Sequence, residues 1–400
     1  MIFHSIGATL ASLNTPPLVA TVGLITFTVL PATRRAALSS SLATLKFLDI
    51  ASFTLNCFAV SVPGRIGGRQ YTMMGEGFPL NPDKPNALGQ RKGPKTEFGE
   101  GGEETAPLQP GEGGYGREPS GDYEAIGDDG DGTIPYPQAR GRTLVSPSGW
   151  AFVIWGPIYA GEAIFVVAQL FCSSSRGGLG AVLPMISAPF VTANVLQSLW
   201  CASFRPKYGT GRWGAFVSPA MMAGTAIALS DVHGTFRAAA EIASDIGASS
   251  SSALFWYSLP LTLHFGWTTA AFLIDLNGAV SSDPSNPDGL VVAFGHMSAL
   301  LATVLAATVT ARRSAPLYGA TIAWALAGCA DGMKRRVLSA AAAEAAAEAA
   351  AQDEGTSPSR EGRREEGRLR MLRAAARQEL LCWVGCAACA LFSVTAIARG

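Results

Sequence analysis

The sequence contains few charged residues. Only 15% of its 400 residues are Asp, Glu, Lys or Arg, whereas a soluble globular domain usually carries about 25%. Acidic and basic residues are equal in number, so the formal net charge is +0 and no nucleic-acid partner is indicated. Because 48% of the residues are hydrophobic, the composition instead predicts a protein that lies in a lipid bilayer.

Sequence motifs of catalysis and metal binding are also missing. The chain has no phosphate-binding loop, no nucleophile elbow and no zinc-ligand spacing. Its seven cysteines lie in or beside apolar segments, where they are simplest to interpret as small packing side chains. We therefore expect no catalytic residue, no metal ligand and no obligatory cofactor, and we predict that the protein is not an enzyme.

Long apolar runs, by contrast, are abundant. A helix that crosses a bilayer needs about 20 mostly apolar residues. The even apolar character of these runs differs from the alternating pattern of a membrane β-barrel. The sequence therefore predicts an all-α, polytopic transmembrane helix bundle with about eight spans. These spans are expected at about 45–65, 149–172, 181–204, 213–231, 253–276, 289–311, 316–333 and 379–398.

Three other regions have a different composition. Residues 1–44 contain no acidic residue, which is typical of an organelle-targeting extension to a plastid or mitochondrion; an additional apolar helix over Pro16–Pro31 is the alternative. Residues 67–147 are rich in Gly and Pro and predict a disordered loop. Residues 334–378 combine an alanine run with alternating acids and arginines, which predicts a charged helical loop outside the bilayer.

The predicted span at 149–172 carries the first candidate site residues. Trp150 lies at the helix entrance, where an indole can anchor at the lipid headgroups. Trp155, Tyr159 and Glu162 share one helical face. A carboxylate inside a span usually faces the bundle interior, so this face predicts a pocket wall with one polar anchor. The alternative is that Glu162 is protonated, or bonded to a neighbouring helix for packing.

The predicted span at 253–276 contains a second set. Pro260 is expected to kink the helix, and His264, Trp267 and Asp275 follow along one face. His264 is a candidate haem ligand or proton carrier. A histidine that only forms a packing hydrogen bond is the simpler interpretation, and the same holds for His296.

The predicted span at 181–204 contains a third set. Asn194 and Gln197 share a helical face, and Trp200 is adjacent. Buried amides of this kind either hold helices together or bind the polar groups of a ligand. The sequence leaves both uses open.

These motifs resemble the TspO/MBR family, the translocator proteins and tryptophan-rich sensory proteins formerly called peripheral benzodiazepine receptors. The spacing is closer to the longer branch of that family, in which extra helices follow the core. The resemblance implies a five-helix core at 45–278 and three additional helices in 279–400. The matching residues are Pro147, Gly149, Phe152, Trp155 and Tyr159, then Asn194 and more loosely Trp200, and finally Pro260, Gly266, Trp267 and Ala271.

The sequence departs from the family pattern at three places. Gln197 stands where the family usually has Trp, and Asp275 stands where it usually has Asn. The loop before Pro147, which helps to cover the pocket in the family, is far longer here. These departures concern the identity of the ligand more than the fold.

The resemblance also implies a function. Family members bind porphyrins and other flat hydrophobic ligands, take part in tetrapyrrole and sterol traffic and stress signalling, and often form homodimers. We therefore expect a receptor or translocator for a porphyrin, haem, sterol or lipid. The expected ligand-binding residues are Trp150, Phe152, Trp155, Tyr159, Glu162, Asn194, Gln197, Trp200, Pro260, His264, Trp267 and Asp275.

Two alternatives remain open at this point. A proton-coupled secondary transporter of a small solute would use Glu162, His264 and Asp275 as its proton path. No internal repeat of helices, which many transporters show, is evident in the sequence. Conversion of a bound porphyrin in light or oxygen is the weaker alternative.

Overall fold

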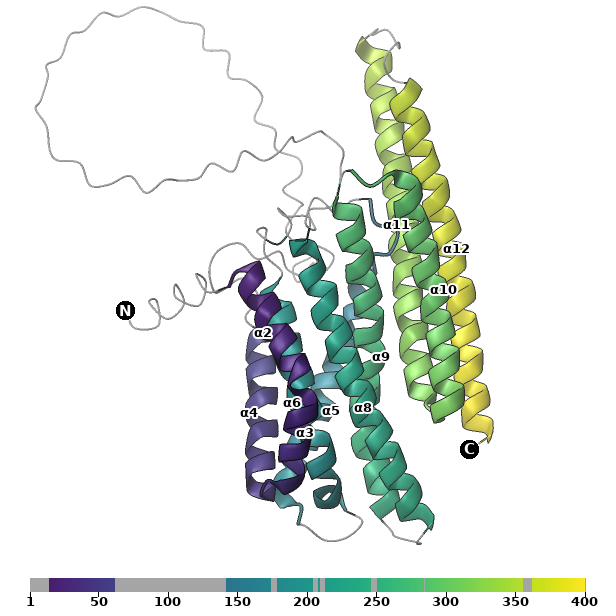
Figure 1. Ribbon diagram of the computed structural model, residues 1–400. Coiled ribbons are helices and arrows are strands. Elements are labelled where there is room, and N and C mark those ends of the chain that lie inside the picture. The colour runs from purple at the N-terminus through teal and green to yellow at the C-terminus, as the bar shows by residue number, and fades with distance from the viewer. Residues whose placement is uncertain are drawn as a thin grey trace, which may run out of the picture. The chain divides into compact units, whose positions relative to one another are not determined.

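The computed structural model describes most of the chain outside the region between residues 62 and 141. The predicted loop at 67–147 therefore lies almost entirely outside the described residues. Every regular element in the described part is a helix (Figure 1). The described residues are 14–61, 142–173, 178–203, 208, 213–245, 250–283, 285–354 and 362–399.

The chain begins with three helices that precede the predicted loop. They are α2 (Pro16–Thr28), α3 (Leu30–Ser39) and α4 (Leu42–Ser61). Helices α2 and α3 meet at a bend of 50°, so the pair is either one broken span or a re-entrant loop. Pro31 lies at the start of α3, where its missing N–H ends the hydrogen-bond ladder of α2. The 16–39 segment is thus helical and packs against α6.

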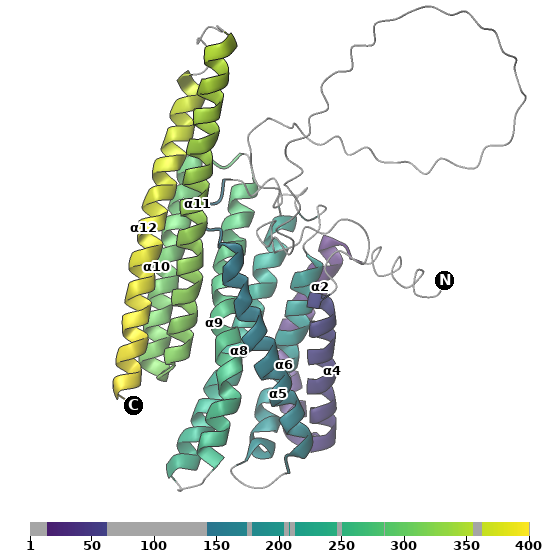
Figure 2. The same cartoon turned by 180° about the vertical axis from the view of Figure 1, so that it is seen from behind.

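The remaining helices form two groups along the chain. The first contains η3 (Gly149–Ile154), α5 (Trp155–Phe171), α6 (Leu179–Ala202), η4 (Gly214–Phe216), α8 (Val217–Asp245) and α9 (Ser250–Ser282). The second contains α10 (Asp288–Arg313), α11 (Pro316–Glu354) and α12 (Gly362–Arg399). The two groups lie side by side in both views, and α9 contacts α10 and α11 (Figures 1 and 2).

In the described part of the chain, six helices are long and apolar enough to cross a membrane, and the bent α2–α3 pair would make a seventh. Six of the eight predicted spans overlap these six helices. The other two predicted spans, at 253–276 and 316–333, are helical within α9 and α11. Polar side chains lower the hydropathy of α9, and most of those in its central turns are buried against other helices rather than exposed to lipid.

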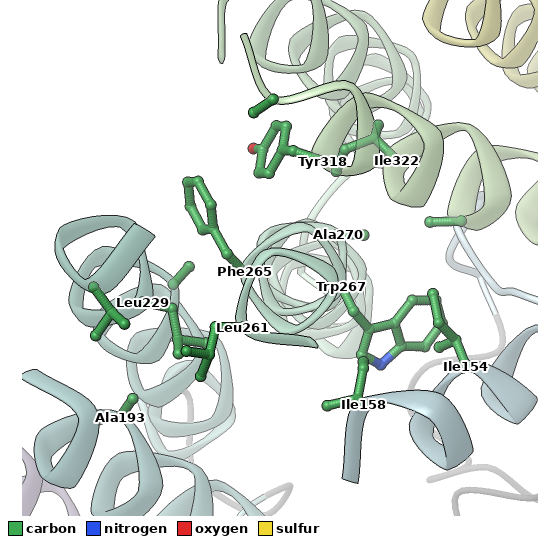
Figure 3. Close-up of a cluster of buried hydrophobic side chains, with 14 of the residues drawn as sticks. Ile154, Ile158, Ala193, Leu229, Leu261, Phe265, Trp267, Ala270, Tyr318 and Ile322 are labelled. Carbon is green, nitrogen blue, oxygen red and sulfur yellow. The ribbon is translucent and has the colours of Figure 1, made fainter. Parts of the chain in front are cut away.

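Helix α9 packs against helices of both groups, and three of its side chains show how. Leu261 points toward Leu229 of α8, and Trp267 points toward α5 (Figure 3). Phe265 points toward Tyr318 of α11, with the two ring centroids 4.5 Å apart (Figure 3). Because α9 contacts α5, α8, α10 and α11, its residues reach both groups of helices.

Small residues allow these helices to approach closely. A β-carbon at Gly161 of α5 would lie 2.5 Å from the Pro260 β-carbon of α9, and one at Gly266 would lie 2.7 Å from Thr321 of α11. Lipid tails are as apolar as the side chains, so helices in a bilayer associate through such tight packing and not through hydrophobic burial alone. The contact at Gly161 fixes the spacing of α5 and α9.

We predict that Gly161→Ala lowers the thermal unfolding midpoint of the purified protein in detergent. The added methyl group would overlap the rigid Pro260 ring, and overpacking of this kind costs about 1–3 kcal/mol. Gly156→Ala is the matched control on the same helix, because nothing lies within 4 Å of a β-carbon there. Equal midpoints for the two variants would show that α5 and α9 are not in close contact.

Candidate functional site

The segment that leads into α5 is attached to α11. The Trp150 indole N–H donates to Asp331 Oδ2 at 2.9 Å, and its ring packs edge-on against Trp324 at 4.8 Å. Trp324 in turn donates from its indole nitrogen to the Ala151 carbonyl at 2.8 Å. Trp150, predicted to anchor at the headgroups and to bind ligand, thus packs on α11 in the structure.

Four aromatic side chains and one histidine converge where α5, α6 and α9 meet. The Trp155 ring stacks on Tyr159 with centroids 5.5 Å apart and lies 6.3 Å from Trp200. It also meets His264 at 5.7 Å and Trp267 at 6.1 Å, both edge-on. These five residues are called the aromatic cluster below. Trp155 contacts all the others, which places it at the centre.

Two phenylalanines extend the aromatic cluster. Phe152 of η3 meets Trp267 edge-on at 5.6 Å. Phe53 of α4 lies 6.3 Å from the Tyr159 ring. Phe152 was predicted from the sequence as a site residue, whereas Phe53 was not. Through Phe53, helix α4 also contributes to the site.

Glu162 and His264 form a buried contact between α5 and α9. His264 Nδ1 lies 2.6 Å from Glu162 Oε1, and the two side chains are 1% and 0% exposed. A carboxylate in a span is costly unless it has a partner inside the protein, and His264 is that partner. The alternative interpretation that Glu162 bonds to a neighbouring helix therefore agrees with the geometry.

A chain of amides connects α4, α6 and α5. The Asn56 side chain donates to Asn194 Oδ1 at 3.0 Å and to Gln197 Oε1 at 2.7 Å. Gln197 Nε2 donates to the Tyr159 hydroxyl oxygen at 3.1 Å. These bonds lock Tyr159 in place beside Trp155. Gln197, which departs from the family pattern, thus supports the aromatic cluster.

Asp275 lies at a different place from the Glu162–His264 pair. Its Oδ2 accepts from the Trp200 indole N–H at 2.6 Å and from the Ser218 hydroxyl at 2.6 Å. Asp275 therefore orients Trp200, whose ring is part of the aromatic cluster.

Pro260 also serves packing in the structure. Its ring lies against Gly161, as described above, and α9 continues through it. The structure therefore brings together the predicted residues on η3, α5, α6 and α9, except Trp150 and Pro260, which make contacts outside the aromatic cluster.

The comparison with protein-family models gives one match. The model described as "TSPO-like protein" matches residues 130–351, which is more than half of the chain. The chain belongs to the TSPO-like protein family. No curated protein and no solved structure matches it. The matched region includes η3, α5, α6, α8, α9 and α10, and it begins after α4 and ends within α11.

Family membership and the six long apolar helices together identify this TSPO-like chain as an integral, multi-pass membrane protein. The lipid bilayer is therefore its environment. Exposed apolar side chains on the outer helices fit that environment, because lipid tails accept them without cost. On α12, for example, only 22% of the most apolar window is buried within the protein, compared with 67% on α6.

Besides Phe53, two polar residues that support the aromatic cluster of the TSPO-like chain are not among the residues predicted from the sequence. Asn56 lies on α4, outside the matched region, so no family motif points to it. Ser218 lies at the start of α8, where a serine is unremarkable. Asn56 could have been found as a strongly polar residue within the apolar 45–65 segment, the same signal that led to Glu162.

Four buried polar atoms in or beside the aromatic cluster have no hydrogen-bond partner among the described residues. They are Glu162 Oε2, His264 Nε2, Trp267 Nε1 and Asn56 Oδ1. Most buried polar atoms in native proteins are paired with protein or water, so four in one region require explanation. A polar group of a ligand, or a bound water, would supply the missing partners.

No metal site is found among the described residues. They contain no group of three or more His, Cys, Asp or Glu side chains that could hold a metal ion. Cys386 and Cys389 of α12 do have the Cys-x-x-Cys spacing, but they lack further ligands in the described part of the chain.

A small cavity lies outside the aromatic cluster, between α9, α10, α11 and α12. Its volume is about 20 Å³, which is enough for one water molecule. The lining is mainly apolar, with Ser298, Gln378 and two thiols as its polar members. His296 Nδ1 lies 2.6 Å from Gln378 Oε1, which gives His296 the packing role expected for it.

The Glu162–His264 contact leads to a prediction about stability. Removing one member leaves the other buried without its partner, so Glu162→Leu and His264→Leu should each lower the unfolding midpoint. The double variant should lose less than the sum of the two losses, with a coupling of about 1–3 kcal/mol in a double-mutant cycle.

The matched control is the exposed pair Arg237–Glu241 of α8, whose atoms lie 2.8 Å apart. Exposed pairs are worth little, so its cycle should give a coupling below about 1 kcal/mol. A Glu162–His264 coupling equal to that of this control pair would contradict the buried contact.

Proposed function

We propose that this TSPO-like protein is a membrane receptor or translocator that binds a flat hydrophobic ligand at the aromatic cluster. The ligand class is a porphyrin or other tetrapyrrole, with a sterol or lipid as further members. A role in the traffic of such molecules or in stress signalling follows from this proposal, and a homodimer is the assembly that the family relationship favours. Haem would bind as a ligand and not as a resident cofactor.

The observation that carries the proposal is the position of the unpartnered atoms. Glu162 Oε2 and His264 Nε2 belong to a pair that lies against the Trp155 ring, and Trp267 Nε1 belongs to a second ring in contact with it. Aromatic rings can stack on a flat π system, and few convergent polar groups among them are typical of small-molecule sites. The aromatic cluster therefore offers both rings that can stack on a flat ligand and polar atoms that can bond to it.

Binding requires the aromatic rings to separate, because they already contact one another. Trp155 and Tyr159 are only partly buried, unlike Trp200 and Trp267, which are each 1% exposed. Tyr159 is held by its bond to Gln197, so Trp155 is the member of the cluster that can move at least cost. We propose that the Trp155 side chain rotates to admit the ligand between α5 and its neighbours.

Titration with protoporphyrin tests this proposal. Saturable quenching of the tryptophan fluorescence is expected for the purified full-length protein. Trp155→Ala should weaken binding by roughly threefold to tenfold, because each aromatic pair contributes about 0.5–1.5 kcal/mol. Trp155→Phe should retain most of the affinity, since the replacement ring can still stack.

Trp383→Phe is the matched control, because Trp383 lies on α12 and is 46% exposed. This variant loses one tryptophan without touching the aromatic cluster, so its affinity should equal that of the wild-type protein. Absence of saturable quenching, or equal affinities for Trp155→Ala and the control, would remove the proposed site.

A second function, proton-coupled transport of a small solute, is favoured by the Glu162–His264 contact. A buried carboxyl and imidazole 2.6 Å apart can exchange a proton. Asp275 is a weaker member of such a path, because it bonds to Trp200 and Ser218.

Proteoliposomes with an imposed pH gradient test the transport function. With a candidate solute, uptake should follow the gradient, and Glu162→Gln should abolish this dependence while the helical content of the variant remains that of the wild type. Glu241→Gln is the control at an exposed position. Uptake that ignores the gradient, or that Glu162→Gln leaves unchanged, rejects the transport function.

A further inference from the structure

Helices α4, α5 and α6 carry polar residues in two layers, and only one of the layers belongs to the site described above. In that layer lie Asn56, Glu162 and Asn194. The other layer lies seven residues away on each helix and contains Asp49, Gln169 and Ser187. Seven residues are about two helical turns, so each pair lies on one face of its helix.

Contacts confirm that the residues of the Asp49 layer form a spatial group. Asp49 bonds to Ser187, and the Gln169 amide lies beside the Asp49 carboxyl. An aromatic pair, Phe165 and Phe190 at 5.4 Å, occupies the positions between the two layers on α5 and α6. The Asp49 layer is therefore separate from the aromatic cluster.

The Asp49 layer is fully buried and only partly paired. Asp49 and Gln169 are each 0% exposed, and Ser187 is 2% exposed. By hydrogen-bond geometry, Asp49 Oδ1 and both polar atoms of the Gln169 amide have no partner among the described residues. Buried polar atoms are normally paired, so a negative charge on Asp49 would be poorly compensated in this layer.

The single hydrogen atom of the Ser187 hydroxyl indicates that Asp49 carries a proton. Ser187 Oγ lies 3.0 Å from Asp49 Oδ2 and 2.9 Å from the Leu183 carbonyl oxygen. A hydroxyl group has one hydrogen, so it can donate to only one of these oxygens. Both contacts become hydrogen bonds when Asp49 carries a proton, donates it to Ser187 Oγ, and Ser187 donates to Leu183.

The charges around Asp49 lead to the same conclusion. Among the described residues, no basic side chain forms an ion pair with it. Lys46, one turn earlier on α4, directs its amine to the carbonyls of Leu170 and Cys172 at 3.3 and 2.7 Å. Glu162 on α5 is acidic, and residues 183–190 of α6 contain no ionisable group. A carboxylate left unpaired in such a place is costly, and the neutral acid is not.

We infer that Asp49, which bonds to Ser187 and lies beside Gln169, is a proton-binding site of this bundle. It forms a second protonatable layer beside the one that contains Glu162 and His264. The Lys46 amine donates to carbonyls at the end of α5, and Asp49 follows Lys46 by one turn. Asp49 therefore lies close to the membrane face at which α5 ends. The site is independent of the ligand proposed for the aromatic cluster and would bind its proton in the absence of that ligand.

Infrared spectroscopy of the full-length protein in lipid nanodiscs tests the inference. The carbonyl stretch of a protonated carboxylic acid is separate from the carboxylate bands. At neutral pH, the wild-type spectrum should contain such a band, and D49N should lose it. S187A should keep the band at a shifted frequency, because the acid loses its acceptor. E162Q is the matched control and should leave the band in place.

Folding of the variant is checked independently. Asn at position 49 can donate to Ser187 as the protonated acid does, so D49N should unfold at the wild-type midpoint at neutral pH. Raising the pH should lower the midpoint of the wild type more than that of D49N. Protoporphyrin should quench D49N as it quenches the wild type, because the Asp49 layer is separate from the aromatic cluster. The infrared test uses no ligand, so its outcome does not depend on the ligand proposal.

Two results would overturn the inference. Identical acid bands in the wild type and D49N would show that Asp49 is ionised. A stabilisation by Na⁺ relative to K⁺ that D49N loses would show that the unpartnered oxygens of this layer bind a cation in place of a proton.

Discussion

The lack of hydrogen-bond partners in lipid governs the interior of this protein. A polar side chain in a span must find its partner on another helix, because the surrounding hydrocarbon provides none. Glu162 meets His264, Asp275 meets Trp200 and Ser218, and Asn56 meets two amides of α6. Each of these contacts joins two or more helices. The polar residues therefore determine which helix faces lie inward, and the aromatic cluster forms where those faces meet.

Close packing provides the second contribution to the architecture. Gly161 and Gly266 let α5 and α11 approach α9 within van der Waals contact. As a result, α9 holds the imidazole of His264 and the indole of Trp267 in fixed positions relative to Trp155. The rings on α9 therefore lose little conformational entropy when a ligand stacks on them, and the cost of opening the site falls mainly on Trp155.

Much of the helix bundle and part of the site follow from the sequence. Apolar run length predicts the spans well, because the bilayer thickness fixes it. The shared face of Trp155, Tyr159 and Glu162 can be predicted from the sequence because all three residues lie on one helix. The residues of other helices that contact this face cannot be predicted in this way. Asn56 lies more than 100 residues from Tyr159, and only the packing of α4 against α6 shows that it belongs to the site. The contact of Trp150 with Asp331 is hidden from the sequence in the same way, since Asp331 is on a late helix.

The segment before α5 is held at several points by the C-terminal part of the chain. Arg142 donates to the carbonyls of Ser281 and Asp283 where α9 ends, at 3.3 and 2.6 Å. The Ser148 backbone N–H donates to the Gly328 carbonyl of α11 at 2.9 Å. The segment that leads into the first turn of α5 is therefore fixed by hydrogen bonds to the end of α9 and to α11. Any shift of α11 along its axis would be transmitted to Trp155, so the helices that follow the core can set the position of its central aromatic ring.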